Sequence, residues 1–355
     1  MAPDSFKGSI SAAAAAAALA AGWLSVRPDD EVIQLPLADG GEGTLAVLAA
    51  ALPASRLHPA EVSGPGDAQV LAAWLEVPPN AAVIELAAAA GLTQLEELRP
   101  LEAHSYGVGQ LIGLALDSGA HRIVIALGGS ACTDGGTGAL AALGARFLDA
   151  TGSELPLGGG ALIRLARLDL AGLRPAPAGG VSCLTDVGAP LTGPAGAAAV
   201  FGPQKGASQD DIAVLDAGLA RLAGLLGGRP DAPGSGAAGG AGYGFAAAWG
   251  ARLLPGAAEI AGIAGLPAAL ATADLVITGE GQYDRTSGSG KVVSAVCAAA
   301  DQAGVPVALV AGVVSAEPSA AAGVVELAAL AGGREPAMTR AAHWLELAGR
   351  QLAAL

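Results

Sequence analysis

Apolar residues along the chain fall into two alternating patterns. Short continuous apolar runs, typical of strands buried on both faces, alternate with longer segments in which apolar residues recur at helical spacing. Expected strands cover residues 31–37, 82–86, 121–127, 181–187, 274–281, 306–312 and 324–330. Expected helices cover residues 44–52, 107–119, 138–145, 208–228, 291–304 and 335–355, and another is expected to begin after Ser9. This alternation predicts an α/β fold with parallel sheets.

One region departs from the alternation. Two strand-like runs, Leu57 to Val62 and Val70 to Val77, are separated by the turn sequence SGPGD. They predict a hairpin, and hence an antiparallel insertion near residues 57–86. The glycine-rich stretch from Gly227 to Gly244 lacks the serines and charges of a solvated linker, so we expect a tight loop and a closely packed helix start.

Four polar loops follow expected strands, namely ADGGEGT, GGSACTDGG, LTDVGAP and TGEGQYD. Each combines glycines with an acidic residue. Ligands of parallel sheets gather at the carboxyl ends of the strands, so we expect these loops at one common edge. Glycine lets backbone N–H groups approach a phosphate, and carboxylates can hold Mg²⁺ or accept a proton. Ordinary βα turns share this composition, but four such loops together favour a phosphate site.

Composition narrows the classes of function. The 355 residues suffice for two domains, and the net charge of −14 with no basic block argues against a nucleic-acid partner. No apolar run reaches the length of about 20 residues that a membrane span needs, so no membrane association is expected. The three cysteines, Cys132, Cys183 and Cys297, show no spacing for zinc or disulfides, which indicates a reducing, cytoplasmic location.

The basic residues are 15 arginines and only three lysines, Lys7, Lys205 and Lys291, each next to a glycine. Lysine is a compact charge on a flexible stem, whereas arginine is a planar fork. The lysines are therefore candidates for contacts with phosphate, although stray surface lysines would give the same pattern.

Common nucleotide motifs are absent. GSGSGKV places Arg285 where the first glycine of a P-loop belongs and Val292 after the lysine. GVGQLIG has Ile112 where the last glycine of a dinucleotide motif belongs. Ser130 lacks the elbow sequence of a hydrolase nucleophile, so we expect the amides of residues 128–130 to bind an anion instead.

Five ordered segments together resemble the bacterial glycerate kinase family, type I. They are APDSFKGS, PLADGGEGT, ALGGSACTDGGTGALAALGARFLDATG, GPAGAAAVFGPQKGAS and DLVITGEGQYD followed by GK. The resemblance implies ATP-dependent phosphorylation of D-glycerate at its 2-hydroxyl, giving 2-phosphoglycerate. It also implies two α/β domains, one of them flavodoxin-like and built from both chain ends (residues 1–62 and 272–355), with residues 63–271 inserted as the second. The family has a strand before its opening motif, and here only Met1 precedes Ala2, so residues 1–4 are expected to keep at most a stub of strand.

The candidate residues follow from these motifs. We expect Lys7 to contact a phosphate, Asp186 to act as the base, and Asp134 to orient the substrate. Asp39, Asp186 and Glu280 are the candidates for Mg²⁺ or a neighbouring base. The expected substrate- and phosphate-binding set is Asp4, Ser5, Asp39, Gly40, Gly41, Gly128, Gly129, Ser130, Lys205, Glu280, Asp284 and Lys291. For each carboxylate, capping of a loop or helix is the alternative.

Other functions stay open at this point. A non-catalytic regulator that binds phosphometabolites could use the same fold, and the kinase could form 3-phosphoglycerate. The expected partners are the small molecules ATP and D-glycerate, and the sequence leaves open whether the chain forms a homodimer.

Overall fold

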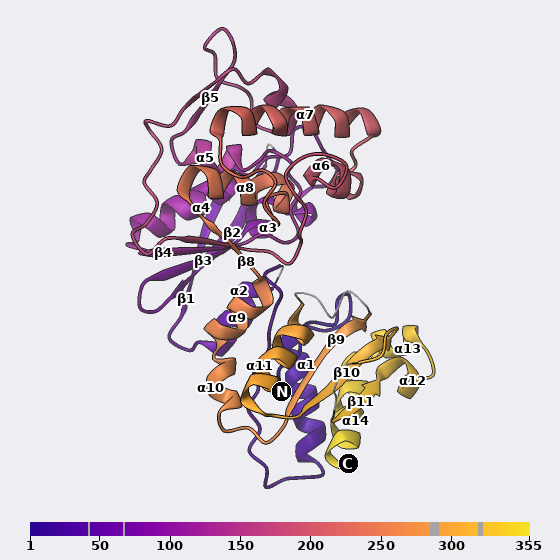
Figure 1. The fold of residues 1–355 in the computed structure, drawn as a ribbon. Helices are drawn as coiled ribbons and strands as arrows, with labels where there is room; N and C mark the ends of the chain where they lie inside the picture. The colour runs from indigo at the N-terminus through magenta and orange to yellow at the C-terminus, as the bar shows by residue number, and fades with distance from the viewer. Residues whose placement is uncertain (42, 67, 285–290, 319–321) are drawn as a thin grey trace. The chain divides into compact units, whose positions relative to one another are not determined.

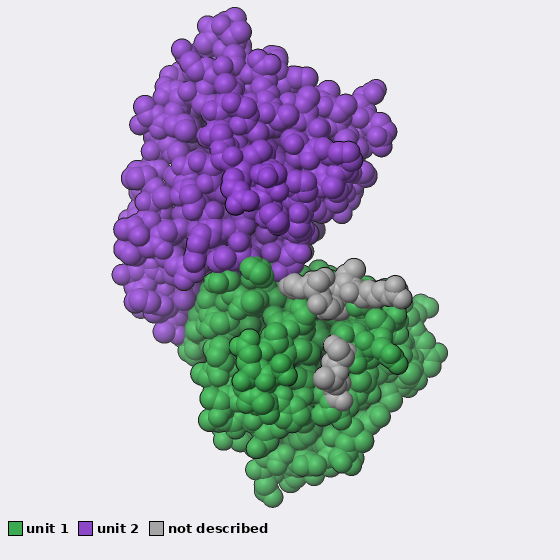
Figure 2. Space-filling model, viewed as in Figure 1, with its two compact units in different colours: residues 1–39, 46–53, 255–355 green, residues 40–45, 54–254 purple. Residues whose placement is uncertain are grey.

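The chain folds into two compact units (Figure 2). The computed structural model describes residues 1–41, 43–66, 68–284, 291–318 and 322–355. Unit 1 comprises residues 1–39, 46–53 and 255–355, and unit 2 comprises residues 40–45 and 54–254. Both ends of the chain lie in unit 1 (Figure 1). Unit 1 is therefore built from both ends of the chain, and unit 2 from its middle.

The boundaries between the units differ from the expected ones at residues 62/63 and 271/272. Strand β1 (Arg56–Ser63) lies in unit 2, because it pairs along its whole length with β2 (Gln69–Val77) in an antiparallel hairpin. Helices α9 (Gly256–Ala264) and α10 (Leu266–Leu270) lie in unit 1, where they pack against α11 (Val292–Ala303). Strand pairing decides the first boundary and helix packing decides the second, and the sequence pattern alone gives neither.

Unit 2 is built on a sheet with the strand order β1-β2-β3-β4-β7-β8. The remaining strands of this sheet are β3 (Ala81–Glu85), β4 (Arg122–Ala126), β7 (Val181–Leu184) and β8 (Arg252–Leu254). The hairpin is antiparallel, and the strands from β3 to β8 are parallel, so the expected antiparallel insertion is confirmed. Two short strands that the sequence did not predict, β5 (Arg146–Leu148) and β6 (Arg167–Asp169), form a separate ribbon.

Helices bury one face of this sheet. Those of unit 2 are α3 (Leu86–Ala90), α4 (Tyr106–Asp117), α5 (Thr137–Ala142), α6 (Ala197–Phe201), α7 (Gln209–Leu226) and α8 (Ala237–Trp249), with 3-10 turns η1 (Leu92–Gln94), η2 (Gly159–Arg164) and η3 (Pro203–Lys205). Ile84, Ile125 and Cys183 from the strands share one core with Leu111 and Phe245 from the helices. Helix α8 is buried from its start, which confirms the close packing expected of the glycine-rich stretch.

Unit 1 contains a parallel sheet with β9 (Val276–Tyr283), β10 (Val307–Val314) and β11 (Gly323–Glu326) in the order β11-β10-β9. Backbone bonds extend it beyond β9. Ala2 and Asp4 donate to carbonyls of β9, and Leu35 and Leu37 donate to the carbonyls of Met1 and Pro3. Counted in chain order, the segments lie 2-1-3-4-5, which is the flavodoxin-like arrangement. Residues 1–4 form no regular strand, in line with the expected stub, and residues 31–37 are an extended segment where a strand was expected.

Helices cover both faces of the unit 1 sheet. Besides α9, α10 and α11, the helices of unit 1 are α1 (Ala12–Leu24), α12 (Leu327–Ala331), α13 (Arg334–Thr339) and α14 (Ala341–Ala353), together with most of α2 (Thr44–Ala51). Val310 of β10 packs with Leu19 and Leu345 of α1 and α14, whereas the neighbouring Leu309 packs with Val293 of α11. This alternation is the two-fold side-chain period of a strand buried on both faces.

Two expectations near the carboxyl terminus were wrong. The segment expected as one strand over 324–330 is β11 followed at once by α12, and the single closing helix is two helices separated at Arg340. Within the described residues, no helix is both long and apolar enough to cross a membrane. All three cysteines are free thiols.

Candidate active site

A cavity of about 320 Å³ opens at the carboxyl edge of the unit 1 sheet. Its lining gathers residues that are far apart in the sequence and that were predicted separately. Those predicted residues are Asp4, Ser5, Lys7, Asp39, Glu280, Asp284 and Lys291. The expectation that distant polar loops of the chain meet in one pocket therefore holds for the segments within unit 1.

The opening segment PDSFKGS supplies one wall of this cavity as a tight turn. The backbone N–H groups of Phe6 and Ile10 each donate to the other residue's carbonyl oxygen, and the turn between them passes through Gly8 with φ +77°. Phe6 is 2% exposed and anchors the turn in the core, while the side chain of Lys7 is 81% exposed at the tip. The Lys7 Nζ lies 3.7 Å from an Asp39 carboxylate oxygen. A mobile ammonium is thus held beside an acid at the rim of the cavity.

Asp4 lies deeper in the same cavity. Burial, and after it the nearby charges of Asp39 and Glu280, raise the pKa of Asp4 to about 7, against the opposing effects of the Ser5 N–H and the Lys7 ammonium. The Ser5 N–H donates to Asp4 Oδ1 at 2.6 Å. Like-charged groups are therefore gathered around a space that accepts a cation or a proton.

Unit 2 carries the GGSACTDGG loop at the end of β4. Asp134 in this loop is fully buried, and its carboxylate accepts hydrogen bonds from the N–H and hydroxyl of Ser105 and from the N–H groups of Gly136 and Gly138. The distances are 2.8 to 3.1 Å. These bonds fix the loop to the starts of α4 and α5, which is the capping role that the sequence left as the alternative.

Lys205 also lies inside unit 2. It is 2% exposed, and its Nζ donates to Ser130 Oγ at 2.9 Å and to the Cys132 carbonyl oxygen at 2.5 Å. Removal from water lowers the pKa of this ammonium, and the nearby Cys132 and Asp134 oppose that effect. Lys205, which was expected to bind phosphate, thus donates hydrogen bonds to the glycine-rich loop that contains Ser130 and Cys132.

The four polar loops do not share one sheet edge, so that expectation is corrected. TGEGQYD and Asp39 belong to unit 1, whereas residues 40–45, GGSACTDGG and LTDVGAP belong to unit 2. Within unit 2, Gly40 and Gly41 pack on Gly128, where an added Cβ would lie 2.5 Å from the Gly41 Cα. Asp186 follows β7 and is partly buried. The four loops belong to two units, each with its own sheet, and the sequence pattern does not show how many sheets the strands form.

Sequence reasoning missed two polar residues. Arg334 lines the unit 1 cavity from the first position of α13, and no preceding strand or glycine-acid motif marks it. Glu85 ends β3, is 9% exposed, and accepts a hydrogen bond of 2.6 Å from the N–H of Leu45 in the first turn of α2. An acid at a helix start is favourable, but a lone glutamate at the end of an apolar run gives little signal.

The carboxylates of the unit 1 cavity suit a hard divalent cation. Within the described ranges, no three or more Asp, Glu, His or Cys side chains gather at metal-binding spacing. Mg²⁺ commonly takes only one or two carboxylates and completes its shell with water and substrate phosphates. Asp39 and Glu280 therefore fit Mg²⁺ that arrives with a phosphate ligand, whereas a metal cage made of protein alone is not formed there.

Comparison with known proteins decides the family. The model of the Glycerate kinase family matches residues 1–355. The chain belongs to the glycerate kinase family. It is 42% identical to the glycerate kinase of Bacillus subtilis, over 100% of this chain and 96% of that protein. It is also 42% identical to the glycerate 2-kinase of Escherichia coli, over 88% of this chain and 84% of that protein.

A solved structure agrees with this assignment. The crystal structure of a protein designated glycerate kinase 2, from Salmonella typhimurium LT2, superimposes with a TM-score of 0.87 at 40% identity, covering 99% of this chain and 96% of that one. The α/β fold and the kinase class expected from the sequence are confirmed. The family implies small-molecule substrates for this enzyme.

Proposed function

We propose that this enzyme transfers the terminal phosphoryl group of ATP to the 2-hydroxyl of D-glycerate, which yields 2-phosphoglycerate. The observation that carries the proposal is the full-length family match together with a relative named glycerate 2-kinase at 42% identity. The site chemistry agrees with a reaction between two anionic substrates.

Phosphoryl transfer depends on positioning and on neutralising charge more than on covalent chemistry. Lys7, Lys291 and Arg334 bring positive charge to the lining of the unit 1 cavity. The Lys7 ammonium is exposed and mobile, so it can follow a phosphoryl group as its charge shifts between donor and acceptor.

Asp39 and Glu280 would hold Mg²⁺ together with the nucleotide phosphates. The ion would supply neutralisation of the phosphate charge, which an acidic protein with a net charge of −14 needs locally. The expected third ligand, Asp186, lies in unit 2 at the carboxyl end of β7. We assign to Asp186 the acceptance of the proton from the glycerate hydroxyl, and to Asp134 the support of the loop that carries Ser130.

The proposal is tested by incubating the protein with ATP, Mg²⁺ and D-glycerate and coupling the product to enolase. Enolase converts 2-phosphoglycerate to phosphoenolpyruvate, so a rise in ultraviolet absorbance that depends on ATP supports the 2-phosphate. Formation of ADP that depends on glycerate, without an enolase signal until a phosphoglycerate mutase is added, would instead mean the 3-phosphate. Absence of ADP formation would contradict the kinase assignment for this substrate.

A further inference from the structure

Lys205 is a buried cation whose hydrogen-bond partners are both neutral. Its Nζ donates to Ser130 Oγ and to the Cys132 carbonyl oxygen. Within the described parts of the chain, no carboxylate lies within 4 Å of this ammonium. Burying a charge without a directly paired counter-charge is costly, and the nearby Asp134 offsets the effect of burial only in part. The presence of this lysine in the interior therefore points to a function that a neutral side chain would not supply.

The contact with Lys205 fixes the direction of the Ser130 hydroxyl. An ammonium can only donate, so the Ser130 oxygen is the acceptor in this bond. The hydroxyl proton must then point away from Lys205. Among the described residues the Ser130 hydroxyl makes no second hydrogen bond. Ser130 is 7% exposed and directly follows Gly128 and Gly129 at the end of β4, so its proton is available to a ligand at this loop.

Both partners are held in place before any ligand arrives. The N–H of Lys205 donates to the Gly202 carbonyl in the short turn η3, which Gly206 ends with φ +86°. Asp134, four residues after Ser130, fixes the loop that carries Ser130 through the hydrogen bonds that its carboxylate accepts from the N–H groups of Ser105 and Gly136. Donors fixed in advance stabilise a developing or resident charge better than donors that must first reorient.

We propose that Lys205 is a positioning residue that holds the Ser130 hydroxyl as a hydrogen-bond donor to an anionic oxygen of a bound substrate. The inference rests on the proposed function in taking the substrates to be glycerate, with its carboxylate, and ATP, with its phosphates. We place Lys205 itself out of contact with the ligand, because the residue is only 2% exposed. The burial of its charge also makes the surrounding loop more favourable for an anion.

The test compares Ser130→Ala, Lys205→Met and the double variant by steady-state kinetics. A hydrogen bond to a charged group contributes about 1.5–3 kcal/mol, which corresponds to a roughly 10- to 100-fold rise in KM for the substrate that Ser130 contacts. Lys205→Met should raise the same KM to a similar extent, and the double variant should be no worse than Lys205→Met. The proposal would be overturned if the two single variants raised the KM of different substrates, or if their effects on KM multiplied in the double variant.

Two matched variants complete the test. Ser130→Thr keeps the hydroxyl and should retain a KM near that of the unchanged enzyme, whereas loss equal to that of Ser130→Ala would count against the donor role. Ser118→Ala removes an exposed serine hydroxyl at the end of α4 and should leave both KM values unchanged. A rise in the KM of D-glycerate identifies the ligand oxygen as carboxylate, and a rise in that of ATP identifies it as phosphate.

A binding measurement separates this inference from the proposed function. Inorganic phosphate or D-glycerate is added, and the ligand-induced increase in Tm is compared for the unchanged protein and the variants. An increase that both single variants abolish supports the positioning role even if no glycerate is phosphorylated. Turnover of glycerate with increases in Tm that survive in both variants would leave the kinase assignment intact and refute the positioning role. No increase with either ligand in the unchanged protein would refute it as well.

Discussion

At the edge of the unit 1 sheet, Lys7 is 81% exposed and faces Asp39 across 3.7 Å, beside a cavity that gathers further acids and bases. At the edge of the unit 2 sheet, Asp134 and Lys205 are 0% and 2% exposed, and their bonds are made to the protein's own backbone and hydroxyl groups. Both edges end in glycine-rich loops with charged residues, yet the first leaves Lys7 within reach of solvent and the second encloses Asp134 and Lys205.

The difference in exposure indicates that the charged residues at the two edges have different roles. Charges that can move and titrate suit contact with substrates whose charge changes during the reaction. Buried charges that are hydrogen-bonded to the protein are less able to do this. They hold loop backbones in a fixed geometry, because leaving a buried polar group without its partner is costly. Substitution of Lys7 should therefore impair catalysis, whereas substitution of Asp134 should first lower stability.

The largest effect on stability is expected for Asp134→Ala. It leaves the buried N–H groups of Ser105, Gly136 and Gly138 without an acceptor, and each orphaned donor costs about 1–3 kcal/mol. We expect the free energy of unfolding to fall by about 3 kcal/mol or more, measured by urea denaturation. Asp149→Ala is the matched control, because Asp149 accepts bonds from Thr151 and Ser153 in an exposed turn where water can replace it. Equal losses in the two variants would contradict the distinction.

For Lys7→Ala the expectation is reversed. Loss of a charged donor that acts on the transferring group typically costs about 100-fold or more in kcat. The side chain is mostly exposed, and its distance from Asp39 makes at best a weak surface pair. The melting temperature should thus stay within about 1 °C of that of the unchanged protein. An unchanged kcat would remove Lys7 from the reaction, and a large drop in melting temperature would assign it to the fold.

The sequence predicted the elements better than their partners. Apolar runs located β3, β4, β7, β9 and β10, and the helical spacing of apolar residues located α7, which begins with a capping box at Ser208. These features depend on neighbours within a few residues. The assignment of strands to two sheets depends on pairing between residues up to hundreds of positions apart, so four similar loops appeared to share one edge.

The site shows the same limit at the level of single residues. Lys7, Asp4 and Glu280 came together in one cavity as predicted residues. Lys205 has the same local sequence as Lys7, a lysine followed by glycine, yet one is exposed and the other buried. Burial is set by what packs on a residue from elsewhere in the fold, here the loop with Ser130 and Cys132, and no local pattern carries that information.

A third prediction concerns the dependence of stability on pH. The pKa of Asp4 is raised from 3.8 to about 7 in the folded protein. The folded state therefore keeps a proton that the unfolded state releases, so this group favours folding at low pH. Its contribution is full below pH 3.8 and is lost as the pH rises to about 7. Above that range the buried charge makes the protein less stable, by an amount of the order of a few kcal/mol at most.

Asp4→Asn tests this sign. The amide carries no charge, so the variant should be more stable than the unchanged protein at pH 8, and the difference should shrink toward pH 5. The unfolding curves are to be measured with EDTA present, because a bound cation would stabilise the carboxylate form. A variant that is less stable at pH 8 than at pH 5, relative to the unchanged protein, would show that Asp4 is stabilised as an anion.

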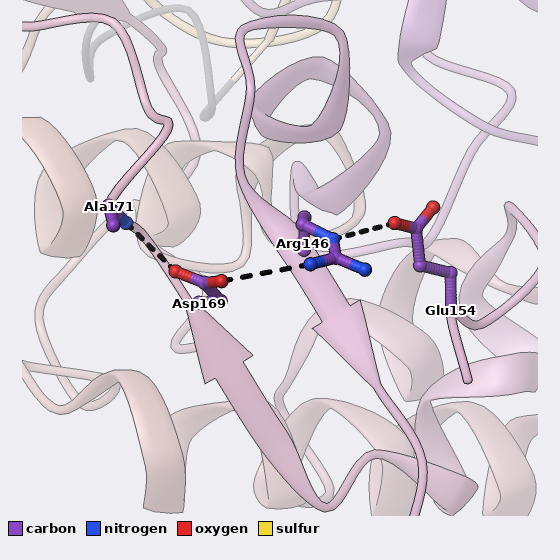
Figure 3. A network of polar contacts seen from close by, with 4 residues as sticks. All are labelled: Arg146, Glu154, Asp169 and Ala171. Atoms are coloured by element: carbon purple, nitrogen blue, oxygen red, sulfur yellow. Dashed lines mark hydrogen bonds and ion pairs between the residues drawn. The ribbon is translucent and has the colours of Figure 1, made fainter. Parts of the chain in front are cut away.

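The smallest effect is expected for the exposed ion pairs of the β5–β6 ribbon (Figure 3). Arg146 Nε lies 2.7 Å from Glu154, and the same guanidinium lies 3.9 Å from Asp169, which also accepts a bond from the N–H of Ala171. The contact with Glu154 raises the pKa of Arg146, but all three side chains are 41% exposed or more. Surface pairs of this kind contribute little, because water and salt screen them.

We therefore expect Arg146→Ala to lower the Tm by no more than about 1 °C, and less still in high salt. Asp134→Ala, which removes a charged side chain from the interior together with the hydrogen bonds that it accepts, should lower the Tm by several times as much. The two variants, measured side by side by thermal melting, compare an exposed charge network with a buried one in the same unit. A larger loss for Arg146→Ala would mean that number of ion contacts, and not burial, decides how much a charged residue stabilises this protein.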